Sequence, residues 1–113
     1  MDTLKKTIFL KSDKIGEGEL GIMLAKGFLN AISQQENLPK SIICVNSAIF
    51  LTTAGENDEI TQILKTIEEK GVKIYSCGTC LDFFEKRDEL KIGIAGNAMD
   101  TANMLLTEDI VTL

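Results

Sequence analysis

The chain has 113 residues, of which 44% are hydrophobic and 26% charged, as expected of one folded domain spanning 1–113. Its formal charge of -5 argues against nucleic-acid binding, because a phosphate-binding surface needs clustered lysine and arginine. The absence of histidine excludes Ser-His and Cys-His hydrolase mechanisms and removes the commonest metal ligand. No apolar run approaches the roughly 20 residues of a membrane span, and the hydrophobic stretch within residues 1–14 is too short for a signal peptide. A cytoplasmic location is therefore expected.

Strand and helix patterns alternate along the chain. Short apolar runs predict strands over residues 6–12, 40–46, 72–76, 90–96 and 109–113. The first predicted helix follows "GEGELG" and has apolar residues at helical spacing from Leu20 to Ile32. The clearest helix lies in residues 56–71, with Ile60, Ile63, Leu64 and Ile67 on one face and Gly71 suited to its C-terminal end. A short helix follows the cysteine pair, and a last one runs through residues 97–107, with Asn97 as N-cap and Asp100 three residues on.

Alternating strands and helices predict a parallel sheet with helices on both faces, since the strands are apolar on both sides. The expected fold is an α/β, three-layer α/β/α sandwich on a mostly parallel sheet of about five strands. Ligands of such sheets bind at the carboxyl ends of the strands. The loops after Ser12, Asn46 and Ser76 share that edge. Asn46 and Ser47 are therefore candidate substrate-binding residues.

The segment "GEGELG" has the glycine spacing of a dinucleotide-binding fingerprint, Gly16-x-Gly18-x-x-Gly21. Two acidic residues within it, Glu17 and Glu19, would repel a pyrophosphate at the helix N-terminus. The second strand also ends in Asn46 rather than in the acid expected at the ribose. A loop that leads into a helix, with no nucleotide, is the favoured interpretation.

The main candidate site is the C-x-x-C of "SCGTCLD". Thr79 and Asp82 have the spacing of a capping box, which predicts Thr79 as the helix N-cap and Cys80 in the first turn. Gly78 lets the backbone approach closely, so that N–H groups can face the Cys77 sulfur and favour its thiolate. Cys77 and Cys80 are the candidate catalytic residues, and the backbone of Gly78 and Thr79 is a candidate substrate-binding group.

Other interpretations of the pair remain open at this point. A zinc site needs four ligands, and this chain offers one close cysteine pair, no histidine and a distant Cys44, so no metal is expected. A thioredoxin-like oxidoreductase would have a cis-proline after its C-x-x-C, whereas Pro39 precedes this pair. Two buried, unreactive thiols are a further possibility. Cys44 lies within an apolar strand and is expected in the core.

Four segments in this order, "GEGELGIMLAKGFLNAI", "LPKSIICVNSAIFLTT", "VKIYSCGTCLDFFEKRDELKIG" and "NAMDTANMLLTEDIVTL", cover nearly the whole chain. Together they resemble the DsrE/F-like family, and within it the C-terminal DsrE-like domain of the YedF family, sulfurtransferase-like proteins associated with selenium metabolism. The resemblance implies a DsrE/F-like fold. It also implies a trimer or hexamer, whose interfaces the apolar segment 47–53 and the first helix would suit.

In that wider family a cysteine just after the third strand accepts sulfur as a persulfide, and Cys77 matches this position. Cys80 is an additional thiol. The implied function is a sulfur or selenium relay that needs no cofactor and exchanges its cargo with donor and acceptor proteins. YedF proteins usually carry a TusA-like domain with a C-P-x-P motif, which nothing in this chain matches. The alternatives are a non-catalytic oligomeric binding module and a thiol-disulfide switch at the C-x-x-C.

Overall fold

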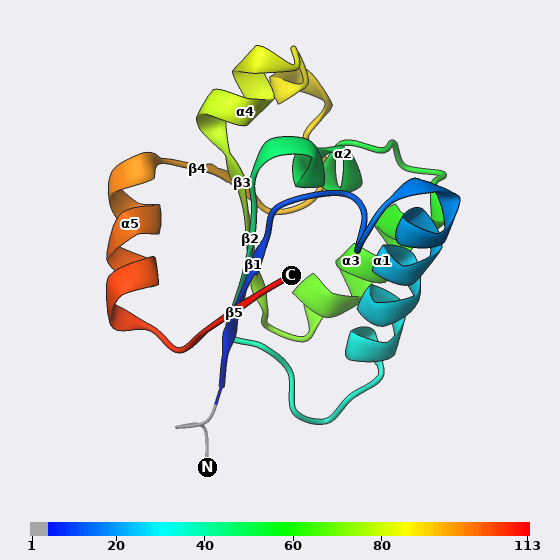
Figure 1. Cartoon of the computed structure of the whole chain (residues 1–113), viewed down its shortest axis with the longest axis horizontal. Helices are drawn as coiled ribbons and strands as arrows, with labels where there is room; N and C mark the ends of the chain where they lie inside the picture. Colours follow the sequence, from blue (N-terminus) through cyan, green and yellow to red (C-terminus); the bar gives the residue numbers. More distant parts are fainter. Residues whose placement is uncertain (1–4) are drawn as a thin grey trace.

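The computed structural model describes residues 5–113, so the first four residues of the N-terminal stretch considered for a signal peptide lie outside it. Five strands and five α-helices alternate along the described chain (Figure 1). Their bounds, with those of two short 3-10 helices, are β1 (Thr7–Leu10), α1 (Gly18–Ser33), β2 (Ser41–Cys44), η2 (Asn46–Ala48), α2 (Ile49–Thr52), α3 (Glu59–Glu69), β3 (Lys73–Cys77), α4 (Gly78–Phe83), η3 (Arg87–Glu89), β4 (Ile94–Gly96), α5 (Ala98–Thr107) and β5 (Ile110–Thr112).

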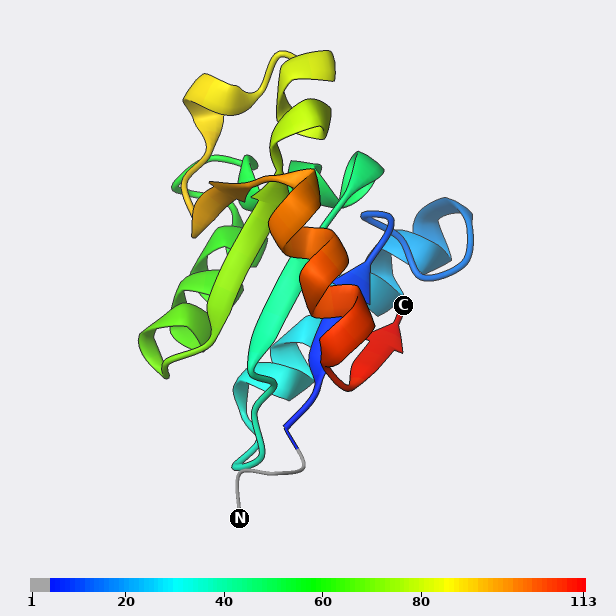
Figure 2. The same ribbon diagram turned by 90° about the vertical axis from the view of Figure 1, so that its left-hand side faces the viewer.

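The five strands form one sheet in the order β4-β3-β2-β1-β5, and every neighbouring pair is parallel. Helices α1 and α3 cover one face, α5 lies on the other, and α4 stands beyond the carboxyl ends of the strands (Figures 1 and 2). The predicted three-layer α/β/α fold is confirmed. No helix within residues 5–113 is both long and apolar enough to cross a membrane.

The main core lies between the sheet and helices α1 and α3. Helix α3 begins where predicted from its pattern, and the Asp58 side chain caps it by accepting the Ile60 N–H at 2.9 Å. Gly71, just past its end, has a φ of +99°, the left-handed conformation that terminates helices. The four apolar residues of α3 that the pattern identifies are all buried against the sheet. Cys44, which lies within the sheet in β2, is buried as well. The core of this layer therefore follows the sequence pattern.

Helix α1 faces the core with a different stripe. Its buried residues are Leu29 and three small ones, Gly21, Ala25 and Ser33, which allow close packing. Several of its large apolar residues point outward, with exposed fractions of 64% for Leu20, 67% for Met23 and 54% for Phe28. Their helical spacing correctly predicts a helix, but these residues form its outer surface. An apolar surface of this kind is typical of an interaction site.

Helix α5 forms the thinner layer. Its predicted N-cap is confirmed, because the Asn97 Oδ1 accepts the Asp100 N–H at 2.9 Å and its Nδ2 donates to the Asp100 carboxylate at 2.9 Å. None of the α5 residues is buried. The helix therefore contributes less to the core than α1 or α3.

The segment that precedes β4 passes very close to β3 at Gly93. We therefore predict that Gly93→Ala destabilises the protein. Its φ is +69°, and an added Cβ would lie 2.0 Å from the Ile74 carbonyl oxygen, which belongs to a buried strand and cannot move away. We expect a loss of at least about 2 kcal/mol in the free energy of unfolding, measured by urea denaturation. Gly27→Ala is the matched control, because that helical position is open space and alanine should add up to about 1 kcal/mol. Equal midpoints for the two variants would contradict the prediction.

Candidate functional site

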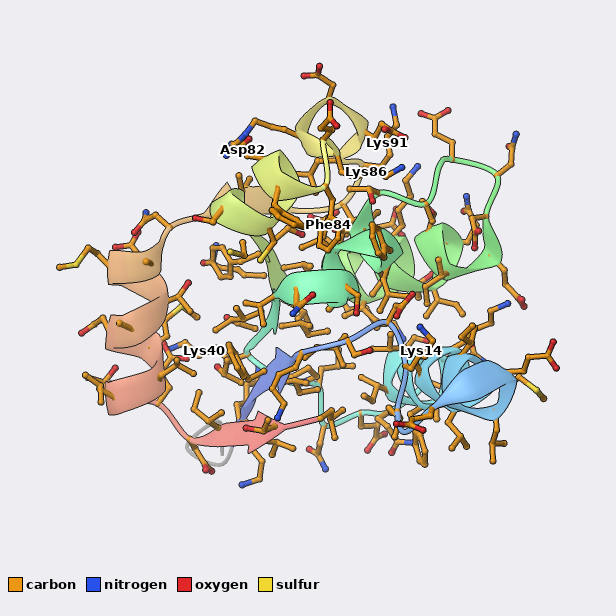
Figure 3. The ribbon with its side chains drawn as sticks, turned by 45° about the horizontal axis from the view of Figure 1, so that its top comes forward. Lys14, Lys40, Asp82, Phe84, Lys86 and Lys91 are labelled. Carbon is orange, nitrogen blue, oxygen red and sulfur yellow. The ribbon has the colours of Figure 1, made fainter. Side chains whose placement is uncertain are left out.

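Three segments meet at the carboxyl edge of the sheet, where the sequence predicts three loops. Two of them follow β1 and β2 and carry Ser12 and the Asn46–Ser47 turn. At the third position no loop follows Ser76, because Cys77 is the last residue of β3 and leads directly into α4. Figure 3 looks toward this edge and shows Phe84 between α4 and α2. There its ring lies 4.8 Å from the ring of Phe50, measured between centroids. The aromatic contact helps hold α4 against the turn that follows β2.

Cys77 is the last residue of β3, and it is half-buried. Its Sγ accepts the N–H of Cys80 at 3.4 Å, so the cysteine itself caps α4. The helix consequently begins at Gly78, and the prediction of Thr79 as the N-cap is wrong: Thr79 lies exposed in the first turn. The predicted capping box fails because the Cys77 sulfur caps the helix by accepting the Cys80 N–H, so the helix begins two residues earlier than a Thr79 cap would require.

Asp82, the other residue of the expected capping box, pairs with Arg87. The carboxylate accepts hydrogen bonds from the Arg87 Nε at 2.7 Å and Nη2 at 3.1 Å. The guanidinium therefore lowers the pKa of Asp82 and has its own pKa raised in return. The ion pair offsets the negative charge that Asp82 would otherwise place near the cysteines.

Arg87 also explains the glycine between the two cysteines. Its Nη2 donates to the Gly78 carbonyl at 3.1 Å, and a Cβ on Gly78 would lie 3.0 Å from this nitrogen and 3.0 Å from the Gly96 carbonyl oxygen of β4. Gly78 is buried, so its predicted role of allowing close backbone approach is supported. Arg87 was not among the predicted site residues, although it is the only arginine in the sequence and lies five residues after Asp82.

Cys80 contacts the loop of the neighbouring strand. Its Sγ accepts the N–H of Asn46 at 3.1 Å, and Asn46 has a φ of +52°, in the left-handed region. Burial raises the pKa of the Cys80 thiol, the hydrogen bond with Cys77 raises it further, and the Asn46 N–H lowers it. The net shift is upward. Cys80 therefore keeps its proton at neutral pH and can donate it in a hydrogen bond to the Cys77 sulfur.

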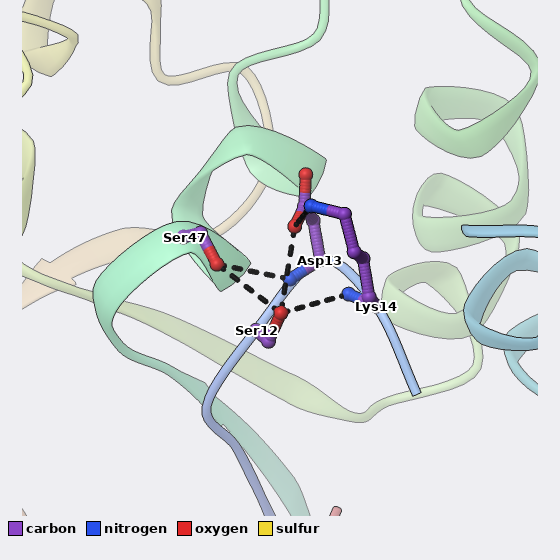
Figure 4. A network of polar contacts seen from close by, with 4 residues as sticks. All are labelled: Ser12, Asp13, Lys14 and Ser47. Atoms are coloured by element: carbon purple, nitrogen blue, oxygen red, sulfur yellow. Dashed lines mark hydrogen bonds and ion pairs between the residues drawn. The ribbon is translucent and has the colours of Figure 1, made fainter. Parts of the chain in front are cut away.

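Ser47, the remaining predicted binding residue, fastens two loops together (Figure 4). Its hydroxyl donates to the Ser12 Oγ at 3.2 Å and accepts the Asp13 N–H at 3.3 Å. The Ser12 Oγ in turn accepts the Lys14 N–H at 3.0 Å, and the Lys14 ammonium pairs with the Asp13 carboxylate at 3.2 Å. The structure thus brings Ser47 to the same edge as the cysteines, where its hydroxyl hydrogen-bonds to the protein itself.

A buried hydroxyl pair lies just before Cys77 in the chain. The Ser76 Oγ and Thr52 Oγ1 are 2.7 Å apart, and the Thr52 hydroxyl also donates to the Ile49 carbonyl at 3.0 Å. Both side chains are fully buried. Since each hydroxyl has a partner, the pair ties β3 to α2 without the cost of an unsatisfied polar group. The sequence offered little signal for this contact, because serine and threonine are ordinarily surface residues.

The glycines of "GEGELG" have structural roles. Gly16 and Gly18 have positive φ values of +84° and +68°, and an added Cβ on Gly21 would lie 3.1 Å from the Gly16 carbonyl carbon. Residues 11–17 separate β1 from α1, whereas a dinucleotide fingerprint needs a tight turn there. The geometry favours the interpretation of this segment as a helix-leading loop.

The third cysteine and the acidic residues show no metal-binding arrangement. Within residues 5–113, no group of three or more cysteine, aspartate or glutamate side chains is placed to hold a metal ion. Cys44 is buried in β2, and burial raises its pKa to about 12. It therefore lies in the core, as its sequence context predicts, and it is not available for thiol chemistry.

Comparison with solved structures identifies proteins of the same fold. YchN of E. coli superposes with a TM-score of 0.71 at 20% identity, over 97% of this chain and 100% of that one. BT1422 of Bacteroides thetaiotaomicron gives a TM-score of 0.66 at 12% identity, over 96% of this chain and 95% of that one. MTH1491 of Methanobacterium thermoautotrophicum gives 0.62 at 13%, over 96% and 99%. The latter two are described as proteins of unknown function.

These superpositions show that the chain has a YchN/DsrE-like fold, as the sequence resemblance implies. No protein-family model matches the sequence, and no curated protein matches it either. The identities are low, so the likeness concerns the fold.

The raised pKa of Cys80 leads to a testable pH dependence. We expect the rate of Cys80 alkylation by iodoacetamide to keep rising above the pH at which a free cysteine levels off, because only the thiolate reacts. Peptide mapping by mass spectrometry after timed quenching measures this rate at each thiol. Cys44 is the internal control and should stay unmodified until the protein is unfolded. A Cys80 profile that coincides with that of a free cysteine would contradict the prediction.

Proposed function

We propose that this protein is a sulfur or selenium relay that carries its cargo as a persulfide on Cys77. The observation that carries the proposal is the environment of this thiol. Cys77 lies half-buried at the carboxyl end of β3, its sulfur accepts a backbone N–H, and a second thiol stands beside it. The resemblance of the sequence to the DsrE/F-like family, and the fold shared with YchN, support the same assignment.

Loading requires no cofactor. The Cys77 thiolate attacks the outer sulfur of a donor persulfide, the donor S–S bond breaks, and the donor leaves as a thiolate. An acceptor thiolate then attacks the outer sulfur on Cys77, which regenerates the Cys77 thiolate. The backbone N–H of Cys80, 3.4 Å from the Cys77 sulfur, is placed to interact with negative charge there. The same steps serve selenium.

Cys80 supplies a second route for the cargo. Its thiolate attacks the inner sulfur of the Cys77 persulfide, a Cys77–Cys80 disulfide forms, and the outer sulfur leaves as hydrosulfide. A thiol reductant must then restore both thiols. Because the pKa of Cys80 is raised, a smaller fraction of this thiol is ionised at neutral pH, which slows this release relative to an unperturbed cysteine.

The partners of such a relay are proteins that present or accept a sulfur or selenium atom, among them a TusA-like domain. A reducing cytoplasmic setting fits three cysteines that are all free thiols. A homo-oligomer, a trimer or hexamer, is the proposed state. The outward apolar residues of α1 supply a surface for assembly, and beside them lies a groove of about 920 Å³ whose walls include Phe28, Ile32 and Val111.

That same surface favours a second candidate, a non-catalytic oligomeric binding module. In this case the apolar face of α1 and the groove would carry the function, and the cysteines would be dispensable. A third candidate, a thiol-disulfide switch, is favoured by the hydrogen bonding between Cys77 and Cys80. The relay is preferred because Cys77 is exposed enough to react while its partner thiol keeps its proton.

The relay predicts a sulfur adduct on one thiol. After incubation of the native chain with a persulfide donor, intact-mass analysis should show a gain of one sulfur atom that dithiothreitol removes. Cys77→Ser should abolish the adduct, whereas Cys44→Ser should retain it because Cys44 is buried. Cys80→Ser should load and should retain its cargo longer, since it lacks the thiol that releases hydrosulfide. The proposal fails if no adduct forms, or if Cys77→Ser acquires it equally well.

If the proposed oligomer assembles through the outer face of α1, a charge placed on this face should disrupt the assembly. Met23→Asp places a charge at an exposed apolar position, and we expect the assembly to shift to a smaller species because burying an unpaired carboxylate is costly. Size-exclusion chromatography with light scattering measures the mass. Leu106→Asp, at another exposed apolar position on α5, is the control and should leave the mass unchanged. A monomeric native chain, or a native mass for Met23→Asp, would exclude α1 as the assembly surface.

A further inference from the structure

The turn after β2 holds its backbone N–H groups in fixed directions. Asn46 opens η2 with a φ of +52°, and its N–H points at the Cys80 Sγ, 3.1 Å away. On either side, the Val45 N–H donates to the Leu10 carbonyl at 3.0 Å and the Ala48 N–H donates to the Val45 carbonyl at 3.1 Å. Among these three N–H groups, that of Asn46 is the one that donates to the cysteine pair.

A second set of contacts keeps the turn in place. The Ser47 hydroxyl is joined to the loop after β1 through the Ser12 hydroxyl and the Asp13 N–H (Figure 4). Rotation of the Asn46 backbone would pull Ser47 out of this network. Loops from two strands therefore restrain the direction of the Asn46 N–H, in addition to its bond with Cys80 of α4.

The residue type at this position fits the conformation. The left-handed region is accessible to glycine and, among other residues, mainly to asparagine and aspartate. A β-branched residue would disfavour it and draw the backbone, with its N–H, toward another conformation. Asn46 is exposed, so its side chain is not needed to fill the core.

We propose that Asn46 is a positioning residue for Cys80: its N–H orients the Cys80 sulfur and stabilises the thiolate, and so sets the rate at which this cysteine reacts. On a loaded protein the reaction is attack on the inner sulfur of the Cys77 persulfide, with departure of hydrosulfide and formation of the Cys77–Cys80 disulfide. That last step rests on the proposed relay, whereas stabilisation of the thiolate does not.

Several groups raise or lower the pKa of Cys80, and the Asn46 N–H is among those that lower it. Burial and the neighbouring Cys77 both raise the pKa of Cys80, and Cys77 is the titratable group that acts on it. The Asn46 N–H opposes them, as does the backbone N–H of Cys80 itself. Asp82 and Arg87, the charged residues close by on α4 and η3, neutralise each other in an ion pair. Loss of the Asn46 N–H would leave Cys80 with little to favour its thiolate.

Replacing the Asn46 N–H by an ester oxygen, through incorporation of the α-hydroxy analogue of asparagine, removes this one donor and keeps the side chain. In a Cys77→Ser background, where no persulfide chemistry intervenes, we expect alkylation of Cys80 at neutral pH to slow roughly fivefold. The pH–rate profile should shift to higher pH. The same ester at Ser47 is the control, because it preserves the Asn46 donor. Coincident profiles for the Asn46 ester and the parent protein would overturn the proposal.

Two variants of the Asn46 side chain test the same proposal independently of the ester. Asn46→Gly keeps both the N–H and access to the left-handed region, so its Cys80 profile should match that of the native residue. Asn46→Val should shift the profile in the same direction as the ester. A native profile for Asn46→Val, with the chain folded by circular dichroism, would count against the proposal.

On protein loaded with a persulfide donor, the ester should slow hydrosulfide release by a similar factor. If Cys77 does not load, the relay fails while the alkylation result still decides the role of Asn46. If Cys77 loads and hydrosulfide release is unaffected by the ester, positioning by Asn46 fails while the relay stands.

Discussion

Leu10 of β1 pairs with Cys44 of β2, and Cys44 pairs with Ser76 of β3, so three parallel strands end at nearly the same level. Every contact in the site depends on this register. A shift of one residue in β2 would turn Cys44 to the opposite face of the sheet, and it would move the Asn46 N–H away from α4. Burial opposes such a shift, because all four residues of β2 are buried and a shift could draw the exposed, charged Lys40 into the sheet.

The two sulfur atoms of the site have different supports. The Cys77 sulfur is held by its own helix, through the Cys80 N–H, whereas the Cys80 sulfur is held by the loop of another strand, through the Asn46 N–H. The arrangement gives one half-buried thiol at a strand end and one protonated neighbour. Such an asymmetry suits the proposed carrier role, whereas in a symmetric dithiol either cysteine could attack or leave with equal ease.

Much of the fold could be predicted from the sequence. Strands apolar on both faces indicate a parallel sheet covered on both sides, and the apolar spacing of α3 indicates a helix with one buried face. The convergence of the three strand ends followed from topology alone. The start of α4 could not be predicted, since "SCGTCLD" satisfies two capping patterns and the tertiary position of Cys77 decides between them. Nor could the buried stripe of α1, where small residues face the core and larger apolar ones face outward. The partnership of Arg87 with Gly78 depends on how the chain returns after α4, which local patterns do not encode.

The hydroxyl pair between Ser76 and Thr52 divides the site into a fixed part and an adjustable part. It joins the last buried residue of β3 to α2 within the core, so the backbone leading to Cys77 is tied to that helix. Helix α4, by contrast, is short, and apart from Gly78 and Leu81 its residues are only partly buried or exposed. A conformational change at this site would therefore move Cys80 relative to a stationary Cys77. In the proposed relay, a partner protein would find the sulfur on Cys77 in one place, whereas Cys80 could move only by breaking its bond with the Asn46 N–H.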